Sequence, residues 1–157
     1  MKILGIDPGL SQTGIAILSE EEGKTKLSWK TVGHKANKER LHNYFKSLSE
    51  LISTEKPDQV VIENIFKGPN TKTLIKIAEL RGVYLLLTQI EGLPIQEFTP
   101  REIKQSVTGS GASSKEQVRY MVKKILGIKE EIPLDVSDAF GAIICYLNKS
   151  NKYAGIN

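Results

Sequence analysis

Two hydrophobic patterns alternate along the chain and predict its secondary structure. Short apolar runs bounded by glycine, proline or charged residues predict strands at residues 2–7, 13–18, 26–32, 59–62 and 95–98. Apolar residues at helical spacing predict helices over residues 38–54 and 71–91. They also predict a separate helix that ends at residue 126 and a last helix that begins near residue 135. Three strands in succession, then a helix, a parallel strand and further alternation, indicate a mixed α/β domain.

Capping residues indicate where two further helices begin. Thr99 followed by Pro100 supplies an N-cap and a first helical position directly after the strand at residues 95–98. Ser113 or Ser114 caps the helix that ends at Leu126. The chain therefore continues as helix after its fifth strand.

The predicted helix at residues 71–91 has an unusual composition. Its second half, with Leu80 and residues 83–87, is apolar on nearly every side. A helix on the surface of a globular protein normally shows one apolar stripe. This helix is therefore either deeply buried or shared between the core and a partner subunit. Residues 83–87 are our candidate for part of such an interface, and burial within one subunit explains them equally well.

Composition limits the class of protein. A chain of 157 residues, 39% hydrophobic and 25% charged, suits one globular domain, and it has no repeat or linker. We expect a single domain over residues 1–149 and a C-terminal tail over residues 150–157. The lone Cys145 has no partner for an internal disulfide, and no signal peptide or membrane-spanning segment is evident. These features predict a cytoplasmic protein that does not enter a membrane.

Positive charge is concentrated in the middle of the chain. The formal net charge is +4, and the segment between Asn64 and Leu126 holds more basic than acidic residues. A basic middle on a nearly neutral body is suited to a polyanionic partner. An ordinary solvated lysine surface accounts for the same charge equally well.

Four acids fall where the predicted elements begin or end. Asp7 ends the first strand and Glu63 ends the fourth, while Asp135 and Asp138 share one face of the first turn of the last helix. If the first and fourth strands are neighbours, the four carboxylates converge at one edge of the sheet. Small residues such as Ala142 continue the helix face and let it approach the sheet.

Such a cluster has a clear chemical use. Carboxylates at close range repel one another unless cations lie between them. Oxygen ligands favour Mg²⁺ or Mn²⁺, and a pair of such ions is the arrangement used to cleave phosphodiesters. The pattern therefore predicts two magnesium ions per subunit, with manganese as an alternative.

Each acid also has an ordinary structural explanation. Asp7 before Pro8 suits a turn, and Glu63 suits the polar end of a buried strand. Asp135 and Asp138 suit the first turn of a helix, where they interact favourably with its dipole. The placement of all four together favours the metal site, although spacing alone does not establish it.

Six short segments carry motifs that recur in a known order. They are Gly5–Gly14, Ile62–Phe66, Ala78–Val83, Thr99–Gln105, Lys115–Val122 and Asp135–Ala139. In sequence and in order, and over nearly all of residues 1–149, they resemble the motifs of the RuvC family of bacterial Holliday junction resolvases. The resemblance implies a ribonuclease H-like fold, in which a mixed five-stranded sheet is flanked by helices.

The resemblance also implies roles for particular residues. Asp7, Glu63, Asp135 and Asp138 match the four metal-binding catalytic carboxylates, and Lys104 and Lys115 match basic positions near the scissile phosphate. Phe66 matches an exposed aromatic that stacks on bases at the junction, although core packing is its ordinary alternative. The remaining candidate DNA contacts are Lys67, Asn70, Thr71, Lys72, Arg81, Arg101 and Arg119.

The implied partners and activity follow from the same resemblance. The family acts as a homodimer that makes paired symmetric nicks in four-way junction DNA during recombination and repair, and a branch-migration motor is a further implied partner. A ribonuclease H or another nuclease of the same fold would share the acids, but the lysines and Phe66 favour the resolvase. A sugar-kinase-like phosphotransferase needs a second similar half, for which 157 residues leave no room. Four intact acids argue against a junction-binding protein without activity.

Overall fold

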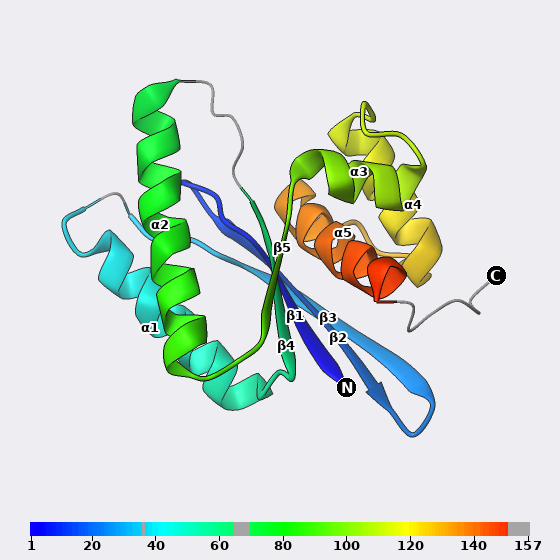
Figure 1. Ribbon diagram of the computed structural model, residues 1–157, viewed down its shortest axis with the longest axis horizontal. Coiled ribbons are helices and arrows are strands. Elements are labelled where there is room, and N and C mark those ends of the chain that lie inside the picture. The colour runs from blue at the N-terminus through cyan, green and yellow to red at the C-terminus, as the bar shows by residue number, and fades with distance from the viewer. Residues whose placement is uncertain (36, 65–69, 151–157) are drawn as a thin grey trace.

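The described part of the chain forms five strands and five helices around a single sheet (Figure 1). The computed structural model describes residues 1–35, 37–64 and 70–150. The strands are β1 (Lys2–Asp7), β2 (Thr13–Glu21), β3 (Lys24–Val32), β4 (Gln59–Glu63) and β5 (Ile95–Phe98). The helices are α1 (Arg40–Glu55), α2 (Thr71–Ile90), α3 (Pro100–Thr108), α4 (Lys115–Leu126) and α5 (Leu134–Lys149).

The sheet has the mixed topology predicted from the sequence. Its strand order is β3-β2-β1-β4-β5. β1 pairs antiparallel with β2, and β2 with β3, whereas β1 pairs parallel with β4, and β4 with β5. Ile6 lies opposite Ile62 in the β1–β4 pair, so Asp7 and Glu63 leave neighbouring strands at the same edge. β1 and β4 are therefore neighbours, which is the condition for bringing these two acids together.

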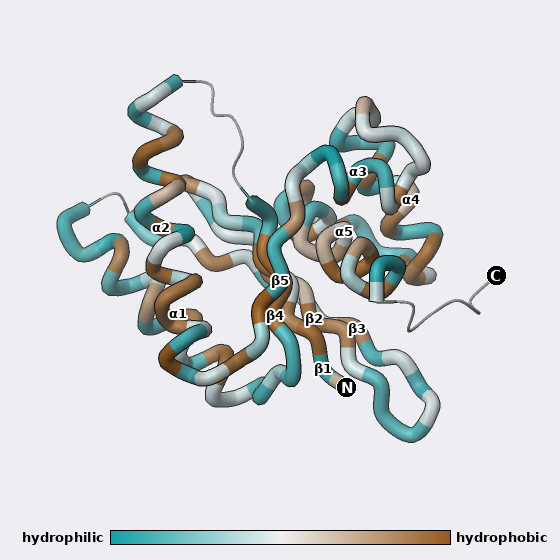
Figure 2. The backbone as a smooth tube through the Cα atoms, viewed as in Figure 1, coloured by the Kyte–Doolittle hydropathy of each residue, from teal (hydrophilic) through white to brown (hydrophobic). Residues whose placement is uncertain are grey.

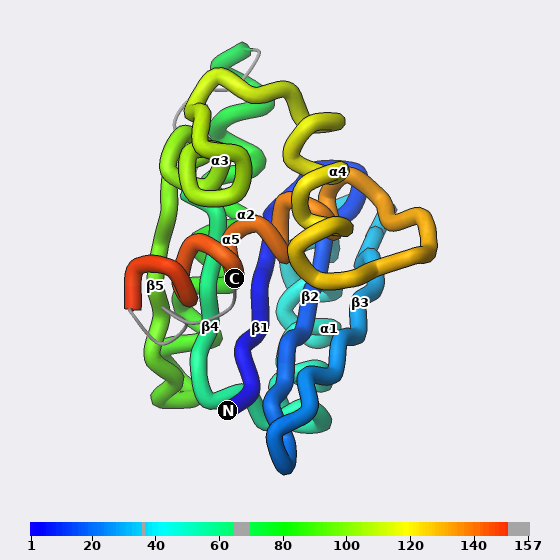
Figure 3. The backbone as a smooth tube through the Cα atoms, turned by 90° about the vertical axis from the view of Figure 1, so that its right-hand side faces the viewer, coloured from blue at the N-terminus to red at the C-terminus, as the bar shows by residue number. Residues whose placement is uncertain are grey.

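Helices cover both faces of the sheet. α1 and α2 lie on one face, and α3, α4 and α5 lie on the other (Figures 1 and 3). Successive residues of β1 alternate between the two cores, with Ile3 facing α5 and Leu4 facing α1 and α2. Figure 2 shows the apolar strands at the centre of the molecule and the polar β2–β3 turn projecting from it.

The backbone of α5 lies directly against β1 and β2. A Cβ atom added at Gly5 would stand 2.4 Å from the carbonyl oxygen of Ala139, and one added at Gly14 would stand 2.1 Å from that of Asp135. Only glycine fits at these two strand positions. The close approach predicted from small residues on the helix is thus made possible by glycines on the strands as well.

The surroundings of α5 differ from a helix with one apolar stripe. Phe140, Ile143, Ile144 and Leu147 are buried as predicted, and so are Ser137, Asp138, Ala142 and Cys145 on other sides. The helix is buried nearly all round because the sheet covers one side while α3 and α4 cover another.

The two strands of the first hairpin are longer than their apolar patterns. β2 continues to Glu21 and β3 begins at Lys24, with Glu22 and Gly23 between them at positive φ. Positive φ at both central residues matches the twist of a tight hairpin. The end of the hairpin is exposed, so its pairing left no hydrophobic signal in the sequence.

The predicted helix boundaries are largely confirmed. Thr99 and Ser114 are N-caps, each within a complete capping box. On α2, Leu80, Tyr84 and Leu87 are buried, whereas Leu86 is 55% exposed. The second half of α2 therefore contacts the core on one side and exposes apolar side chains on another. No helix in residues 1–35, 37–64 and 70–150 is long and apolar enough to cross a membrane.

We expect Gly5→Ala to lower the free energy of unfolding by about 1–3 kcal/mol, because the added methyl group displaces α5 from β1. Ser28→Thr adds the same group to an exposed position of β3 and should change stability by less than about 0.5 kcal/mol. Urea denaturation measures both values. Equal stability of the two variants would contradict the tight contact at Gly5.

Candidate metal-dependent active site

Three of the predicted acids form a compact cluster. Asp7 and Glu63 stand at the carboxyl ends of β1 and β4, and Asp138 reaches them from the second turn of α5. One carboxylate oxygen from each lies within 4.8 Å of the others. Gly5 and Gly14 make this possible, because they allow the start of α5 to lie over the ends of the strands.

Burial and mutual repulsion make these acids hold their protons more tightly than usual. Burial raises the pKa of Glu63 to about 7, and the charge of Asp138 adds to this rise. Burial, followed by the charge of Glu63, raises the pKa of Asp7 well above its ordinary value. The pKa of Asp138 is also raised, chiefly by burial. The cluster is therefore an unfavourable place for three negative charges without a nearby cation.

Two lysines lie close enough to offset part of this charge. Lys115, the first residue of α4, donates from Nζ to Oδ2 of Asp138 at 2.7 Å. Its charge lowers the pKa values of Asp7 and Glu63. Lys104 on α3 likewise lowers those of Glu63 and Asp138. Lys115 therefore contacts the cluster directly, and Lys104 lies near enough for its charge to act on two of the carboxylates.

The fourth predicted acid lies next to the cluster and has a different partner. Asp135, in the first turn of α5, accepts at Oδ2 a hydrogen bond of 2.9 Å from Nε2 of Gln12. Its charge reaches the cluster, since it contributes to the raised pKa of Asp7. Gln12 was not among the predicted site residues, because a glutamine in a loop carries no chemical pattern of its own.

The donor set fits a hard divalent cation. The ligands available are carboxylate oxygens, which Mg²⁺ and Mn²⁺ prefer. Their closeness and raised pKa values show that a positive charge placed among them would relieve repulsion. Asp7, Glu63 and Asp138 are therefore the residues best placed to hold such an ion.

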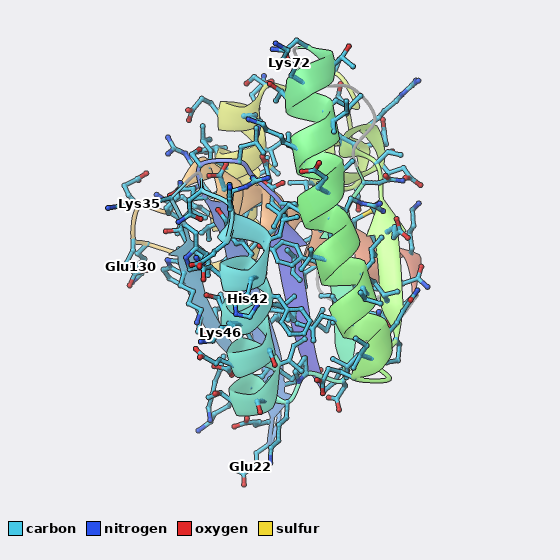
Figure 4. The ribbon with its side chains drawn as sticks, turned by 90° about the vertical axis from the view of Figure 1, so that its left-hand side faces the viewer. Glu22, Lys35, His42, Lys46, Lys72 and Glu130 are labelled. Carbon is cyan, nitrogen blue, oxygen red and sulfur yellow. The ribbon has the colours of Figure 1, made fainter. Side chains whose placement is uncertain are left out.

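Part of the predicted DNA-contacting segment lies at the same end of the molecule. Asn70 is the N-cap of α2 and accepts from the backbone N–H of Thr73 at 2.9 Å. Thr71 and Lys72 follow it and are exposed, and Figure 4 shows Lys72 at this end of α2. The start of α2 and the carboxyl ends of β1 and β4 lie at one end of the sheet (Figures 1 and 3). Phe66 and Lys67 lie outside the described residues.

The three predicted arginines have different surroundings. Arg81 forms an ion pair with Glu97 on β5. Arg119 pairs with Glu116 at 2.6 Å and also donates to the carbonyl oxygen of Ile132. Arg101 is exposed on α3. The charges of Arg81 and Arg119 are thus partly compensated within the chain.

A sheet in the order β3-β2-β1-β4-β5, with carboxylates at the ends of β1 and β4 and on α5, defines a ribonuclease H-like protein. The family model for the crossover junction endodeoxyribonuclease RuvC matches residues 3–146. The chain therefore belongs to the RuvC family, as the sequence motifs predicted.

Individual relatives agree with this assignment. The crossover junction endodeoxyribonuclease RuvC of Syntrophomonas wolfei is 41% identical over 153 residues, which span 94% of this chain and 89% of the relative. That of Carboxydothermus hydrogenoformans is 41% identical over 143 residues, or 88% of this chain and 90% of the relative. Among solved structures, Thermus thermophilus RuvC in complex with a Holliday junction substrate superposes with a TM-score of 0.86 at 26% identity. The superposition covers 97% of this chain and 96% of the Thermus thermophilus chain.

The raised pKa of Glu63 makes stability depend on pH in metal-free protein. The folded state binds this proton more tightly than the unfolded state, so stability falls as pH rises from about 4.5 to about 7. Glu63→Gln removes this contribution. The free energy of unfolding of the variant minus that of the original chain should therefore be larger at pH 8 than at pH 5, by on the order of 2 kcal/mol.

Chemical denaturation in chelator at both pH values measures this difference. Glu130→Gln, which alters an exposed acid, is the matched control and should show no such trend. A Glu63→Gln difference that stays constant with pH would mean that Glu63 ionises normally.

Proposed function

We propose that the chain is a structure-selective endonuclease that resolves four-way DNA junctions by paired, symmetric, metal-dependent nicks. The observation that supports this most is the carboxylate cluster of Asp7, Glu63 and Asp138, within 4.8 Å, in a chain of the RuvC family. The relatives are crossover junction endodeoxyribonucleases, and one structural neighbour is a complex with a Holliday junction. We place the enzyme in the cytoplasm, in recombination and repair.

The four acids would hold two Mg²⁺ ions per subunit, with Mn²⁺ as a substitute. Asp7, Glu63 and Asp138 supply the central ligands, and Asp135 supplies a further oxygen beside them. Bound ions would activate water and neutralise charge on the scissile phosphate. The protein brings the ligands together on two strand ends and one rigid helix, which keeps their arrangement fixed.

Lys115 has a second task in this proposal. Its ammonium group contacts Asp138. A cation bound by the acids would weaken that attraction, because the same carboxylate would then be shared. The ammonium would then be able to contact the scissile phosphate and offset charge that develops in the transition state. Lys104, on the neighbouring helix α3, would act in the same way.

The proposed DNA surface extends from the acids to the start of α2. Thr71 and Lys72 are exposed there and suited to phosphate contacts. The side chain of Asn70 is engaged as an N-cap, so we expect its contact with DNA to be secondary. Phe66 and Lys67 complete this proposed segment, with Phe66 stacking on bases.

The three arginines differ in how readily they could contact DNA. Arg101 is exposed and suited to phosphate. Arg81 and Arg119 would first have to leave Glu97 and Glu116, respectively. We therefore rank Arg101 above these two as a DNA contact.

We propose α2 as the centre of a homodimer interface. Ile75, Leu86 and Ile90 are each more than half exposed, and they lie along one side of the helix. A two-fold dimer would present the same site to two equivalent strands of a junction. A branch-migration motor as a partner remains a prediction from the family resemblance.

Asp7→Asn should lower the rate of junction cleavage by at least about 100-fold. It removes a central ligand of ions that would stabilise the transition state by several kcal/mol. Folding and junction binding should persist, since the change removes an acid that repels its neighbours and keeps nearly the same shape. The assay compares a synthetic four-way junction with linear duplex and RNA–DNA hybrid, each with Mg²⁺ and with chelator. Cutting of the hybrid in place of the junction would contradict the proposed substrate, and normal nicking by Asp7→Asn would contradict the role of Asp7.

Leu86→Glu should convert a dimer to a monomer, because it places a charge in the centre of the proposed interface. Sedimentation of the free protein measures the mass, and the junction assay should show single nicks in place of paired ones. Ile125→Glu alters an apolar side chain of α4 that is 47% exposed and should leave the mass unchanged. A Leu86→Glu protein that stays dimeric would exclude this face of α2.

A further inference from the structure

The side chain of Gln12 connects the β1–β2 loop to the start of α5. Its Nε2 atom donates to Oδ2 of Asp135 at 2.9 Å, across 123 positions of the sequence. The carboxylate oxygen is the acceptor, so the nitrogen end of the amide faces it. The contact therefore holds one oxygen of Asp135 in a defined direction.

The position of Gln12 is fixed by close packing of the loop. A Cβ atom added at Gly9 would stand 2.1 Å from the carbonyl oxygen of Gln12, so the loop folds back tightly there. Gly33, after β3, lies against Ser11 and Gln12 from another side. The next residue, Thr13, is fully buried and shares a hydrogen bond of 2.7 Å with the hydroxyl of Tyr84. Gln12 is thus held between a tight turn and an anchored strand.

Asp135 needs such a partner to have a fixed side chain. Its backbone lies against Gly14, where an added Cβ would stand 2.1 Å from its carbonyl oxygen. That contact places the main chain but leaves the carboxylate free to rotate. Asp138 is held by Lys115, and Asp7 and Glu63 lie against each other within the cluster. The corresponding contact for Asp135 is the one from Gln12.

We propose that Gln12 is a positioning residue for Asp135 in metal binding. The amide holds Oδ2 and leaves the other oxygen of the same carboxylate to bind a divalent cation. A neutral donor suits this task, because it orients the ligand without adding a positive charge that competes with the cation. This inference rests on the proposed metal-dependent function.

The test replaces Gln12 by Met, which is of similar length and has no hydrogen-bond donor. Calorimetry measures Mn²⁺ binding in the absence of DNA. The affinity for the ion that Asp135 helps to hold should fall roughly tenfold. The Mg²⁺ concentration for half-maximal junction cleavage should rise by a similar factor, while the rate at saturating Mg²⁺ changes much less. Gln96→Met alters an exposed glutamine of β5 and should change neither value.

A second variant and a double-mutant comparison separate positioning from general stability. Gln12→Asn keeps the amide but shortens its reach, so it should weaken Mn²⁺ binding in the same direction even if Gln12→Met folds poorly. If Gln12 acts through Asp135, adding Gln12→Met to Asp135→Asn should weaken Mn²⁺ binding no further. Thermal melting of each variant shows that the comparison is made on folded protein.

Two results would overturn the inference. One is unchanged Mn²⁺ affinity and Mg²⁺ dependence in folded Gln12→Met or Gln12→Asn protein. The other is a further loss of Mn²⁺ affinity when Gln12→Met is added to Asp135→Asn, as large as the loss that Gln12→Met causes in the original chain. Failure of the proposed function looks different, because the original chain would then cut no junction while its Mn²⁺ affinity still depended on Gln12.

Discussion

The direct contact of α5 with β1 and β2 is the constraint on which the site depends. A side chain at Gly5 or Gly14 would collide with the backbone of α5. Because the helix lies this close, its first two turns stand over the carboxyl ends of the central strands. Asp138 is thereby brought within 4.8 Å of the two strand acids. A helix at an ordinary packing distance, with side chains between it and the sheet, would leave these carboxylates apart.

The cost of this arrangement is electrostatic. Acids whose pKa values are raised by desolvation and by one another oppose folding at neutral pH, and the lysines of α3 and α4 offset only part of their repulsion. The hydrophobic cores on the two faces of the sheet must supply the remaining stability. The same repulsion favours binding of a cation, so a feature that weakens the fold strengthens the proposed activity.

The sequence predicts the order of elements and most of the acids' positions, because strand ends and helix starts leave local patterns. Asp7 and Glu63 follow apolar runs, and their meeting requires only that β1 and β4 be neighbours. Contacts between side chains far apart in the sequence leave no such pattern. The bond from Gln12 to Asp135 and the pairing of Arg81 with Glu97 are of this kind. The apolar half of α2 stayed ambiguous because it both packs on the core and exposes apolar side chains.

Three consecutive residues connect the carboxylate site to the helix that we propose as the subunit interface. Gln12 contacts the side chain of Asp135, Thr13 bonds to Tyr84 of α2, and Gly14 lies against the backbone of α5. The helix that we propose as the subunit interface is thus joined to the helix that carries two acids through Gln12 and the first residues of β2. This short connection links the proposed interface directly to the site. The paired symmetric cutting that we propose requires two sites at a fixed separation, and this connection would help to fix the site relative to the interface within each subunit.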